Sequence, residues 1–389
     1  MGVNIPDGLS KPCAVAAVLL AAILCASPLK AAFWLDNEER SLFLNMVYAH
    51  AMPEFSAERY EEAVRWVLGS FEVRTGKKLA PGEKRLVGLK VYTNSGEGLE
   101  TPHNLVRAVI KQLQVRGYTK DEIFILDVGQ QFLRDSGYLP ALSQRGSKPN
   151  FEGVRVRTLD EEGMIDKAWF YENPLPVDYT TELGRQMMQD RDAAKDEELR
   201  RSYLPAPLVK DVDFWINLPV VVDSPAMEIS GSMANATLWN TSNRNRFFNS
   251  PANAPVAMAE IAAIPELMDN WALTILSLER YQFIGGPVFN SNYVRSDPIL
   301  LASTDPAILD AWCGRRMNAY RKLTGFDLIN NPPFAVSFAR MVGVGGSNSD
   351  AILWITPQGA NLDPILSYPD RVTEQAPPKQ KAQLFWSVQ

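Results

Sequence analysis

The stretch from 86 to 127 constrains the fold more than any other part of this 389-residue sequence. An apolar, β-branched run, RLVGLKVYT, leads into a loop with two glycines, NSGEGLE, and then into TPHNLVRAVI, whose apolar residues recur at helical spacing. Pro102 suits the first turn of a helix and Gly117 its end, and EIFILD has the composition of a second strand. The stretch therefore predicts a βαβ unit with parallel, buried strands and a right-handed crossover.

Further elements extend this unit on both sides. Residues 37–76 predict a pair of helices separated by Pro53, and the second helix has an apolar face formed by residues three and four positions apart. Later strands are predicted at VRVRTL, DVDFWINLPVVV, WALTILSL and PILLAS. Together these patterns predict an α/β fold with a mostly parallel sheet flanked by helices and an N-terminal helical pair.

The first 31 residues differ from the rest. The uncharged run CAVAAVLLAAILCA is too short to span a bilayer as a stable helix, and small residues follow it, as in a secretory signal peptide. We expect residues 1–31 to be a signal peptide and the protein to be periplasmic or extracellular. Contact with a membrane is then expected only through this segment, if it stays uncleaved.

The remaining chain divides into three parts by composition. Residues 32–80 form the helical N-terminal segment, residues 81–345 the α/β domain, and residues 346–389 a C-terminal extension with a polar, proline-containing tail. The charged stretch GRQMMQDRDAAKDEELRRSYLPAP predicts a solvated helix ended by prolines. It marks a boundary near 180–210 if the domain has two lobes.

Composition excludes several classes of function. The net charge of −6 comes without a stripe of Lys and Arg interleaved with aromatic residues, so nucleic acid is not an expected partner. After export only Cys313 remains of three cysteines, and the chain has two histidines, so neither a disulfide nor a cysteine- or histidine-rich metal site is predicted. Cys313 is expected to be a buried small hydrophobic residue. No nucleophile elbow is present, so a serine hydrolase triad is not expected.

The glycine-containing loop is the first candidate for chemistry. Asn94 and Ser95 follow the first strand directly, where ligands of open α/β sheets collect, and free N–H groups of the next helix begin near Thr101. Such a site suits an anion, although neither phosphate-binding glycine motif is present, and a plain turn explains the loop equally well. Lys90 lies within the predicted strand, where it either takes part in the site or is equally a rim lysine.

Three aspartates are the other candidates. Asp127 ends a strand and either faces the ligand cleft or caps the next helix. Asp305 precedes Pro306 and suits a helix cap, while Asp310 lies well round the same helix from Asp305. The two carboxylates therefore need not share one site.

Seven short motifs in this order resemble the family catalogued as domain of unknown function 362, over roughly residues 86–316. They are LKVYTN (Lys90, Asn94), TPHNLVRAVI (Thr101, Pro102, Val106), ILD (Asp127), DVDFWINLP (Asp213, Pro219), GSMAN (Gly231, Asn235), GGP (Gly285, Gly286, Pro287) and ASTDPAILDAW (Asp305, Pro306, Asp310). Some members are exported or carry ferredoxin-type cysteine clusters, and the resemblance implies no particular reaction or cofactor.

The chain departs from that family pattern at one expected cleft. VVVDSP lacks the lysine and histidine that usually follow LP, Ala234 replaces a lysine before Asn235, and Ser277 stands where an aspartate is common. If these residues bind an anion or a metal in the family, both abilities are in doubt here.

Three functional hypotheses remain. The leading one is an exported soluble protein that binds a small polar or anionic ligand through Asn94, Ser95, Thr101, Asn235 and Asp310 at the carboxyl ends of the strands. The alternative is an enzyme that uses Lys90, Asp127 and Asp305 for acid–base chemistry. The third is a degenerate member with a structural or partner-binding role, for which a protein partner stays open.

Overall fold

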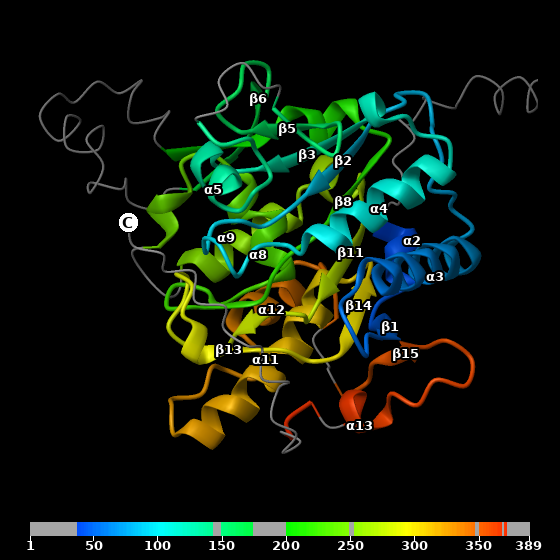
Figure 1. The fold of residues 1–389 in the computed structure, drawn as a ribbon. Helices are drawn as coiled ribbons and strands as arrows, with labels where there is room; N and C mark the ends of the chain where they lie inside the picture. Colours follow the sequence, from blue (N-terminus) through cyan, green and yellow to red (C-terminus); the bar gives the residue numbers. More distant parts are fainter. Residues whose placement is uncertain are drawn as a thin grey trace, which may run out of the picture. The chain divides into compact units, whose positions relative to one another are not determined.

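A nine-stranded mixed sheet is the centre of the protein, which we describe from a computed structural model (Figure 1). The structure describes residues 37–142, 149–173, 200–248, 253–346, 350–367 and 369–371, all of which belong to one compact unit, Trp34–Gln389. The strand order is β15-β1-β14-β11-β8-β2-β3-β5-β4. The strands are β1 (Met46–Ala51), β2 (Val87–Lys90), β3 (Ile123–Asp127), β4 (Asn150–Phe151), β5 (Val154–Thr158), β8 (Phe214–Asn217), β11 (Trp271–Ser277), β14 (Ile299–Ser303) and β15 (Leu353–Ile355).

The βαβ unit forms as predicted. β2 and β3 pair in parallel from Val87↔Ile123 to Lys90↔Leu126, and α4 (His103–Val115) connects them. β8 and β11 on one side and β5 on the other continue the parallel pairing. All of the predicted later strands are present. Because β5, β3, β2, β8 and β11 pair in parallel, their carboxyl ends share one edge of the sheet.

β14 runs against this direction. It is antiparallel to both of its neighbours, β11 and β1, and Ser303 at its end pairs with Thr274. The chain after β14 therefore continues towards the amino end of β11. Asp305 leaves the sheet at the edge opposite to the one where Asp127 ends β3.

The predicted N-terminal helical pair is wrong in its first half. α2 covers only Asn37–Ser41, and the following residues form strand β1. MVYAHA buries Val47 to Ala49 and its backbone pairs with β14 and β15, so pairing in the sheet overrides the helical reading of this stretch. The second helix forms as α3 (Ala57–Thr75), with Ser56 at its N-cap and Gly76 at its end.

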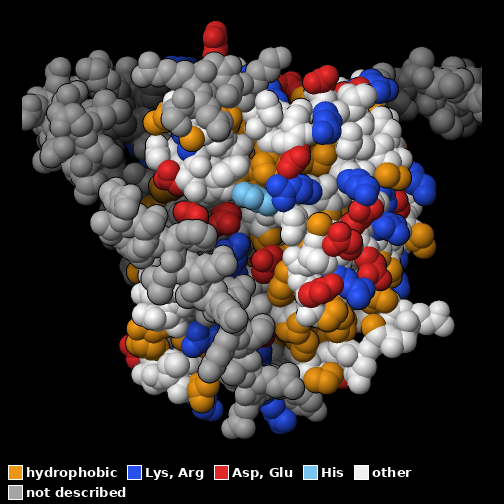
Figure 2. All heavy atoms as spheres, viewed as in Figure 1, with side chains coloured by type: hydrophobic (Ala, Val, Ile, Leu, Met, Phe, Trp, Pro, Cys, Tyr) orange, Lys and Arg blue, Asp and Glu red, His pale blue; other side chains and the backbone are white. Residues whose placement is uncertain are grey.

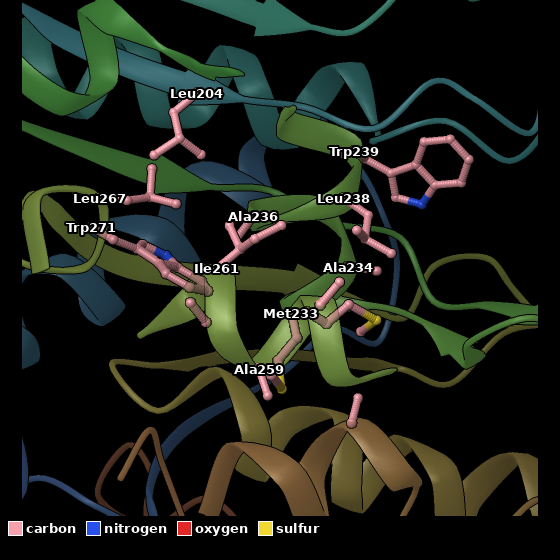
Figure 3. Close-up of a cluster of buried hydrophobic side chains, with 14 of the residues drawn as sticks. Leu204, Met233, Ala234, Ala236, Leu238, Trp239, Ala259, Ile261, Leu267 and Trp271 are labelled. Atoms are coloured by element: carbon pink, nitrogen blue, oxygen red, sulfur yellow. The ribbon is translucent and has the colours of Figure 1, made fainter. Parts of the chain in front are cut away.

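Helices cover both faces of the sheet (Figure 1). α3 and α4 pack on each other and on the face that carries Leu89, Ile125 and Ile216. α8 (Ser232–Ala236), α9 (Asn253–Ala262), α11 (Pro306–Thr324) and α12 (Phe334–Met341) lie on the other side. Figure 3 shows part of the apolar cluster there, in which α8 and α9 pack near the stacked pair Trp215 and Trp271.

Shorter elements complete the described chain. They are α5 (Gln130–Asp135), α10 (Pro265–Met268), α13 (Asp363–Leu366), the single turns η1 (Lys120–Glu122), η2 (Pro207–Asp211), η3 (Leu238–Asn240), η4 (Arg244–Phe247) and η5 (Ser291–Tyr293), the small sheet β10 (Glu228–Ser230), β9 (Val222–Ser224), β12 (Tyr281–Gln282) and β13 (Val294–Arg295), and the pair β6 (Ile165–Glu172) and β7 (Arg201–Pro205).

Several predictions fall partly or wholly outside the described residues. These include the signal peptide, most of the charged stretch and the tail after 371. The described end of the charged stretch, RSYLP, is strand β7 and not the predicted helix, because its backbone pairs with β6. None of the described helices is long and apolar enough to cross a membrane.

Charges of both signs alternate on the face that carries α3 and α4 (Figure 2). Several of them form exposed ion pairs, such as Lys111 with Glu61 and Arg107 with Glu152. Pairs of this kind contribute little to stability, so this face is an ordinary solvated surface.

Candidate functional site

A row of polar residues crosses the sheet on the face covered by α8. Lys90 of β2 pairs in register with Asn217 of β8, Asn217 with Thr274 of β11, and Thr274 with Ser303 of β14. Register partners on neighbouring strands point to the same face of a sheet. All four side chains are buried. A polar layer therefore lies inside the protein, between the sheet and the helices.

Lys90 is the charged centre of this layer. Its Nζ donates to the Val91 carbonyl at 2.7 Å, to Asp127 Oδ1 at 2.8 Å and to Asn235 Oδ1 at 3.0 Å, which uses all the donors of an ammonium group. Burial lowers the pKa of Lys90, and Asp127 opposes that shift. Lys90 is thus an internal ion-pair residue and not the rim lysine that the sequence suggested.

Asp127 performs neither of the roles considered from the sequence, because α5 begins after Gly129 without a side-chain cap and the carboxylate is buried away from any cleft of the described structure. Its Oδ1 accepts from the Val128 backbone N–H at 2.7 Å as well as from Lys90, and its Oδ2 accepts from Thr93 Oγ1 at 2.6 Å. The carboxylate fixes the start of the turn after β3 and also holds Lys90. The side chain is fully buried and its oxygens are engaged.

Asn235 connects this ion pair to α8. Its Nδ2 donates to Asn217 Oδ1 at 2.8 Å, and Asn217 Nδ2 donates to the Ser232 carbonyl at 2.8 Å. Ser232 in turn contacts Thr274, with 3.2 Å between the hydroxyl oxygens. Asn235 is therefore part of a closed network that fixes α8 to three strands.

Asp310 extends the same network to α11. Its Oδ1 accepts from the Ser232 backbone N–H at 2.6 Å and its Oδ2 from that of Met233 at 2.9 Å. Burial raises the pKa of Asp310 to about 7, and these backbone hydrogen bonds oppose the shift. Gly231 makes the approach feasible, because a Cβ there would lie 2.3 Å from Asp310 Oδ1.

The glycine-containing loop is packed as a turn. Ser95 Oγ lies 2.8 Å from the Tyr92 hydroxyl, and Thr101 Oγ1 donates to the Leu218 carbonyl at 2.6 Å. Gly98 has a φ of +99°, and a Cβ there would lie 3.0 Å from the ring of Phe289. The side chains of Ser95 and Thr101 thus stabilise the loop, and their hydroxyls already have protein partners.

Asn94 differs from its neighbours. Its Oδ1 is buried and accepts no hydrogen bond within the described structure, and its Nδ2 lies 3.5 Å from Asp127 Oδ1. Buried amide oxygens are usually paired, so an unpaired one at the carboxyl edge of the sheet indicates a place for a ligand or a water molecule.

Asp305 does not join Lys90 and Asp127. It caps α11 through the Ile308 N–H at 3.1 Å and ties down two distant chain segments by accepting from the N–H groups of Asn45 at 3.1 Å and Gly346 at 2.7 Å. β14 is three strands from β2, which is about 14 Å at the usual strand spacing, and Asp305 lies beyond the opposite edge. The three residues of the enzyme hypothesis therefore do not converge.

Arg244 is the residue that the sequence reasoning missed. It begins η4, and its Cζ lies 5.4 Å from the centroid of the Trp239 ring. None of the described residues accepts a hydrogen bond from its guanidinium or pairs with it as an ion, and its Nε is buried. Burial lowers the pKa of Arg244, while the charges of Asp127 and Asp160 oppose this.

A signal for Arg244 was present in the sequence. The segment between Glu228 and Glu260 has two arginines and no acidic residue, although it is rich in Asn, Ser and Thr. The second arginine, Arg246, does serve the fold, since it donates to the Asn173 carbonyl and to Ser202.

The other reactive side chains have structural surroundings. His50 Nδ1 and His103 Nε2 each lie within 2.8 Å of a backbone carbonyl, of Ala51 and Ser136 respectively. Cys313 is buried, as predicted, and burial raises the pKa of its thiol. The described part of the chain contains no group of three or more His, Cys, Asp or Glu that could hold a metal ion.

Comparison with known proteins gives little beyond this geometry. No family model and no curated protein matches the chain. One crystal structure, of a protein from Thermotoga maritima, aligns with 60% of the chain at 11% identity and a TM-score of 0.32. The chain spans about half the length of that protein, 52%.

Proposed function

We propose that this chain is an exported protein that binds a small anionic ligand at the carboxyl edge of the parallel strands, with Arg244 and Asn94 as the contacting side chains. The observation that carries the proposal is the guanidinium of Arg244, which is partly buried, with its Nε inaccessible to water, and lacks a hydrogen-bonding partner among the described residues. Removing part of a charged group from water without a hydrogen-bonding partner costs free energy, unless a ligand or a water molecule supplies that partner.

An anion is the ligand that fits a guanidinium best. Arg presents a planar fork of N–H donors that binds a carboxylate or a phosphate through two parallel hydrogen bonds. The Trp239 ring makes a cation–π contact with the Arg244 guanidinium, with 5.4 Å between Cζ and the ring centroid, and so helps to hold the guanidinium in place. The free oxygen of Asn94 supplies an acceptor for a hydroxyl or N–H group of the same ligand.

The Lys90 network supports this site from inside. Lys90 and Asp127 neutralise each other at 2.8 Å and are both fully buried, so neither offers a charge to an incoming ligand. Through Thr93 and the turn that follows, Asp127 fixes the backbone that carries Asn94. Lys90, Asp127, Asn235 and Asp310 are positioning residues in this proposal.

The enzyme alternative has less support. Acid–base catalysis needs a titratable group within hydrogen-bonding reach of the substrate. Lys90 and Asp127 are buried with their polar atoms in use, and Asp305 caps a helix at the opposite edge. Binding without turnover is the simpler function for this arrangement.

Membership of the domain of unknown function 362 family rests on the order of the motifs quoted above. Of the departures from its pattern, Ser277 bonds to the Tyr60 hydroxyl at 2.6 Å on the face covered by α3, whereas Ala234 is buried in α8 on the other face, so these two positions do not share one cleft. Export rests on the apolar run at residues 13–26. Cell fractionation with mass spectrometry tests it: a chain shortened by about 27 to 31 residues outside the cytoplasm is expected, and a full-length cytosolic product would contradict it.

A thermal-shift screen of the purified protein tests anion binding. The probes are acetate, benzoate, phosphate and sulfate, each against a chloride control of equal ionic strength, because a bound ligand raises the unfolding midpoint by mass action. Arg244→Gln removes the charge, and we expect it to weaken binding at least about tenfold. Arg65→Gln on exposed α3 is the matched control and should bind like the wild type. If no anion binds, or Arg244→Gln binds equally well, the proposal is wrong.

A further inference from the structure

A cavity of about 390 Å³ lies beside Trp239. Its lining comes from the turn between β9 and β10, from the indole, and from two residues further along the chain: Ser224, Pro225, Ala226, Met227, Trp239, Phe248 and Pro287. Ser224 is the polar residue of this set, and its Oγ faces the backbone N–H of Met227 at 3.3 Å. The cavity thus presents mainly apolar groups.

Trp239 connects this cavity to Arg244. The indole forms part of the cavity wall and also lies under the guanidinium, whose Cζ is 5.4 Å from the ring centroid. Its Nε1 donates to Ser230 Oγ at 2.8 Å, and Phe248 lies against the ring with 5.5 Å between centroids. Figure 3 shows the indole projecting away from the other labelled side chains of the cluster. A fixed aromatic ring therefore borders both an apolar space and a cation that has no partner among the described residues.

The part of the wall formed by Pro287 is also fixed. Gly286 N–H lies 3.3 Å from Asp223 Oδ2, and a Cβ on Gly286 would meet the Asp223 carbonyl oxygen at 1.8 Å. Pro287 is therefore held against β9 by a contact that only glycine allows. The cavity is a preformed feature of the packed chain.

The volume and the lining together define a class of ligand. Small-molecule sites usually have volumes of about 300–1,000 Å³ and apolar walls with a few polar groups. A bare phosphate or a sugar would leave these apolar walls without contacts, whereas a ring or a short acyl chain would fill them. An apolar body alone would leave Arg244 unpaired.

We propose that the ligand is an amphipathic carboxylate, whose aromatic or acyl body occupies the cavity beside Trp239 and whose carboxylate pairs with Arg244. This inference rests on the proposed function for its anionic end and adds the apolar end. The single negative charge matches the single guanidinium, and Asp127 is already neutralised by Lys90.

Calorimetric titration with three probes tests the inference. Acetate carries the charged end alone, 2-naphthol the apolar body without a carboxylate, and 2-naphthoate carries both. We expect 2-naphthoate to bind at least about tenfold more tightly than either of the others, because only it fills both parts of the site.

Two variants assign the parts of the site. Ala226→Phe fills the cavity from a partly exposed position, and it should weaken 2-naphthoate about tenfold or more without changing acetate. Ala57→Phe, at an exposed position on α3, is its matched control. Circular dichroism and the unfolding midpoint establish that both variants fold.

The outcomes separate the two proposals. The inference about the cavity is wrong if 2-naphthoate binds no more tightly than acetate, or if Ala226→Phe weakens 2-naphthoate binding no more than Ala57→Phe does. In either case anion binding at Arg244 stands if Arg244→Gln still weakens the binding of acetate. If 2-naphthoate and 2-naphthol bind equally and Arg244→Gln affects neither, the cavity is a purely apolar site and both proposals fail.

Discussion

Replacing Lys90 with methionine tests the buried network at its centre. The substitution keeps most of the side-chain volume but removes the charge and the three hydrogen bonds that Nζ donates. Asp127 would keep its bonds from Thr93 and Val128 and lose its only ion pair among the described residues. Breaking a buried pair by removing one partner costs about 3–5 kcal/mol, since it leaves an uncompensated charge in the interior.

We therefore expect Lys90→Met to lower the free energy of unfolding by about 4 kcal/mol at pH 7. Urea denaturation, followed by circular dichroism, measures this loss. Lys111→Met is the matched control, because Lys111 on α4 forms an exposed pair with Glu61 and its loss should cost less than about 1 kcal/mol.

The double variant Lys90→Met/Asp127→Asn separates the charge from the packing. It removes the uncompensated carboxylate, so it should lose less stability than Lys90→Met alone, which gives a coupling energy of about 1–3 kcal/mol in the cycle. A loss below about 1 kcal/mol for Lys90→Met, or a cycle without coupling, would refute the view that this ion pair supports the site.

Three further predictions concern the same region. Asp310 has a pKa of about 7 in the fold, above its unfolded value, so its contribution to the free energy of unfolding is fully present below about pH 4 and is lost as the pH rises through 7, by up to about 4 kcal/mol. Asp310→Asn should remove this part of the pH dependence in denaturation curves measured from pH 4 to 8. An unchanged dependence on pH would contradict the assignment. Gly231→Ala should lower the free energy of unfolding by about 2 kcal/mol or more, because the added Cβ would lie 2.3 Å from Asp310 Oδ1. An unchanged free energy in the same denaturation assay would argue against that contact. Arg244→Gln should leave the free energy of unfolding of the ligand-free protein within about 1 kcal/mol of the wild-type value, because only the contact with Trp239 is lost. A larger drop would show that Arg244 has a structural role.

The strands and the βαβ unit could be predicted because their signals are local. Apolar runs, helix-start residues such as Pro102 and stop residues such as Gly117 report on the backbone around them. β1 was missed because its strand character depends on pairing with β14 and β15, which lie far away in the sequence. Local pattern alone read the same residues as helix.

The site was harder to predict for the same reason. Lys90 and Asp127 were found because polar residues at strand ends are conspicuous, but their mutual neutralisation depends on register. Asp305 caps a helix as predicted, but its grouping with Lys90 and Asp127 fails because nothing in PILLAS reveals that β14 runs antiparallel to β11. Arg244 became a candidate only when the structure left it without a partner among the described residues.

Crystals grown with 4-bromobenzoate test the central claim most directly. The anomalous signal of bromine locates the body of the ligand without assumptions about its density. We predict a bromine peak in the cavity formed by Met227, Trp239 and Pro287, with the carboxylate paired to Arg244 and no peak in Arg244→Gln crystals under the same conditions. A peak elsewhere, or equal occupancy in the variant, would contradict the account.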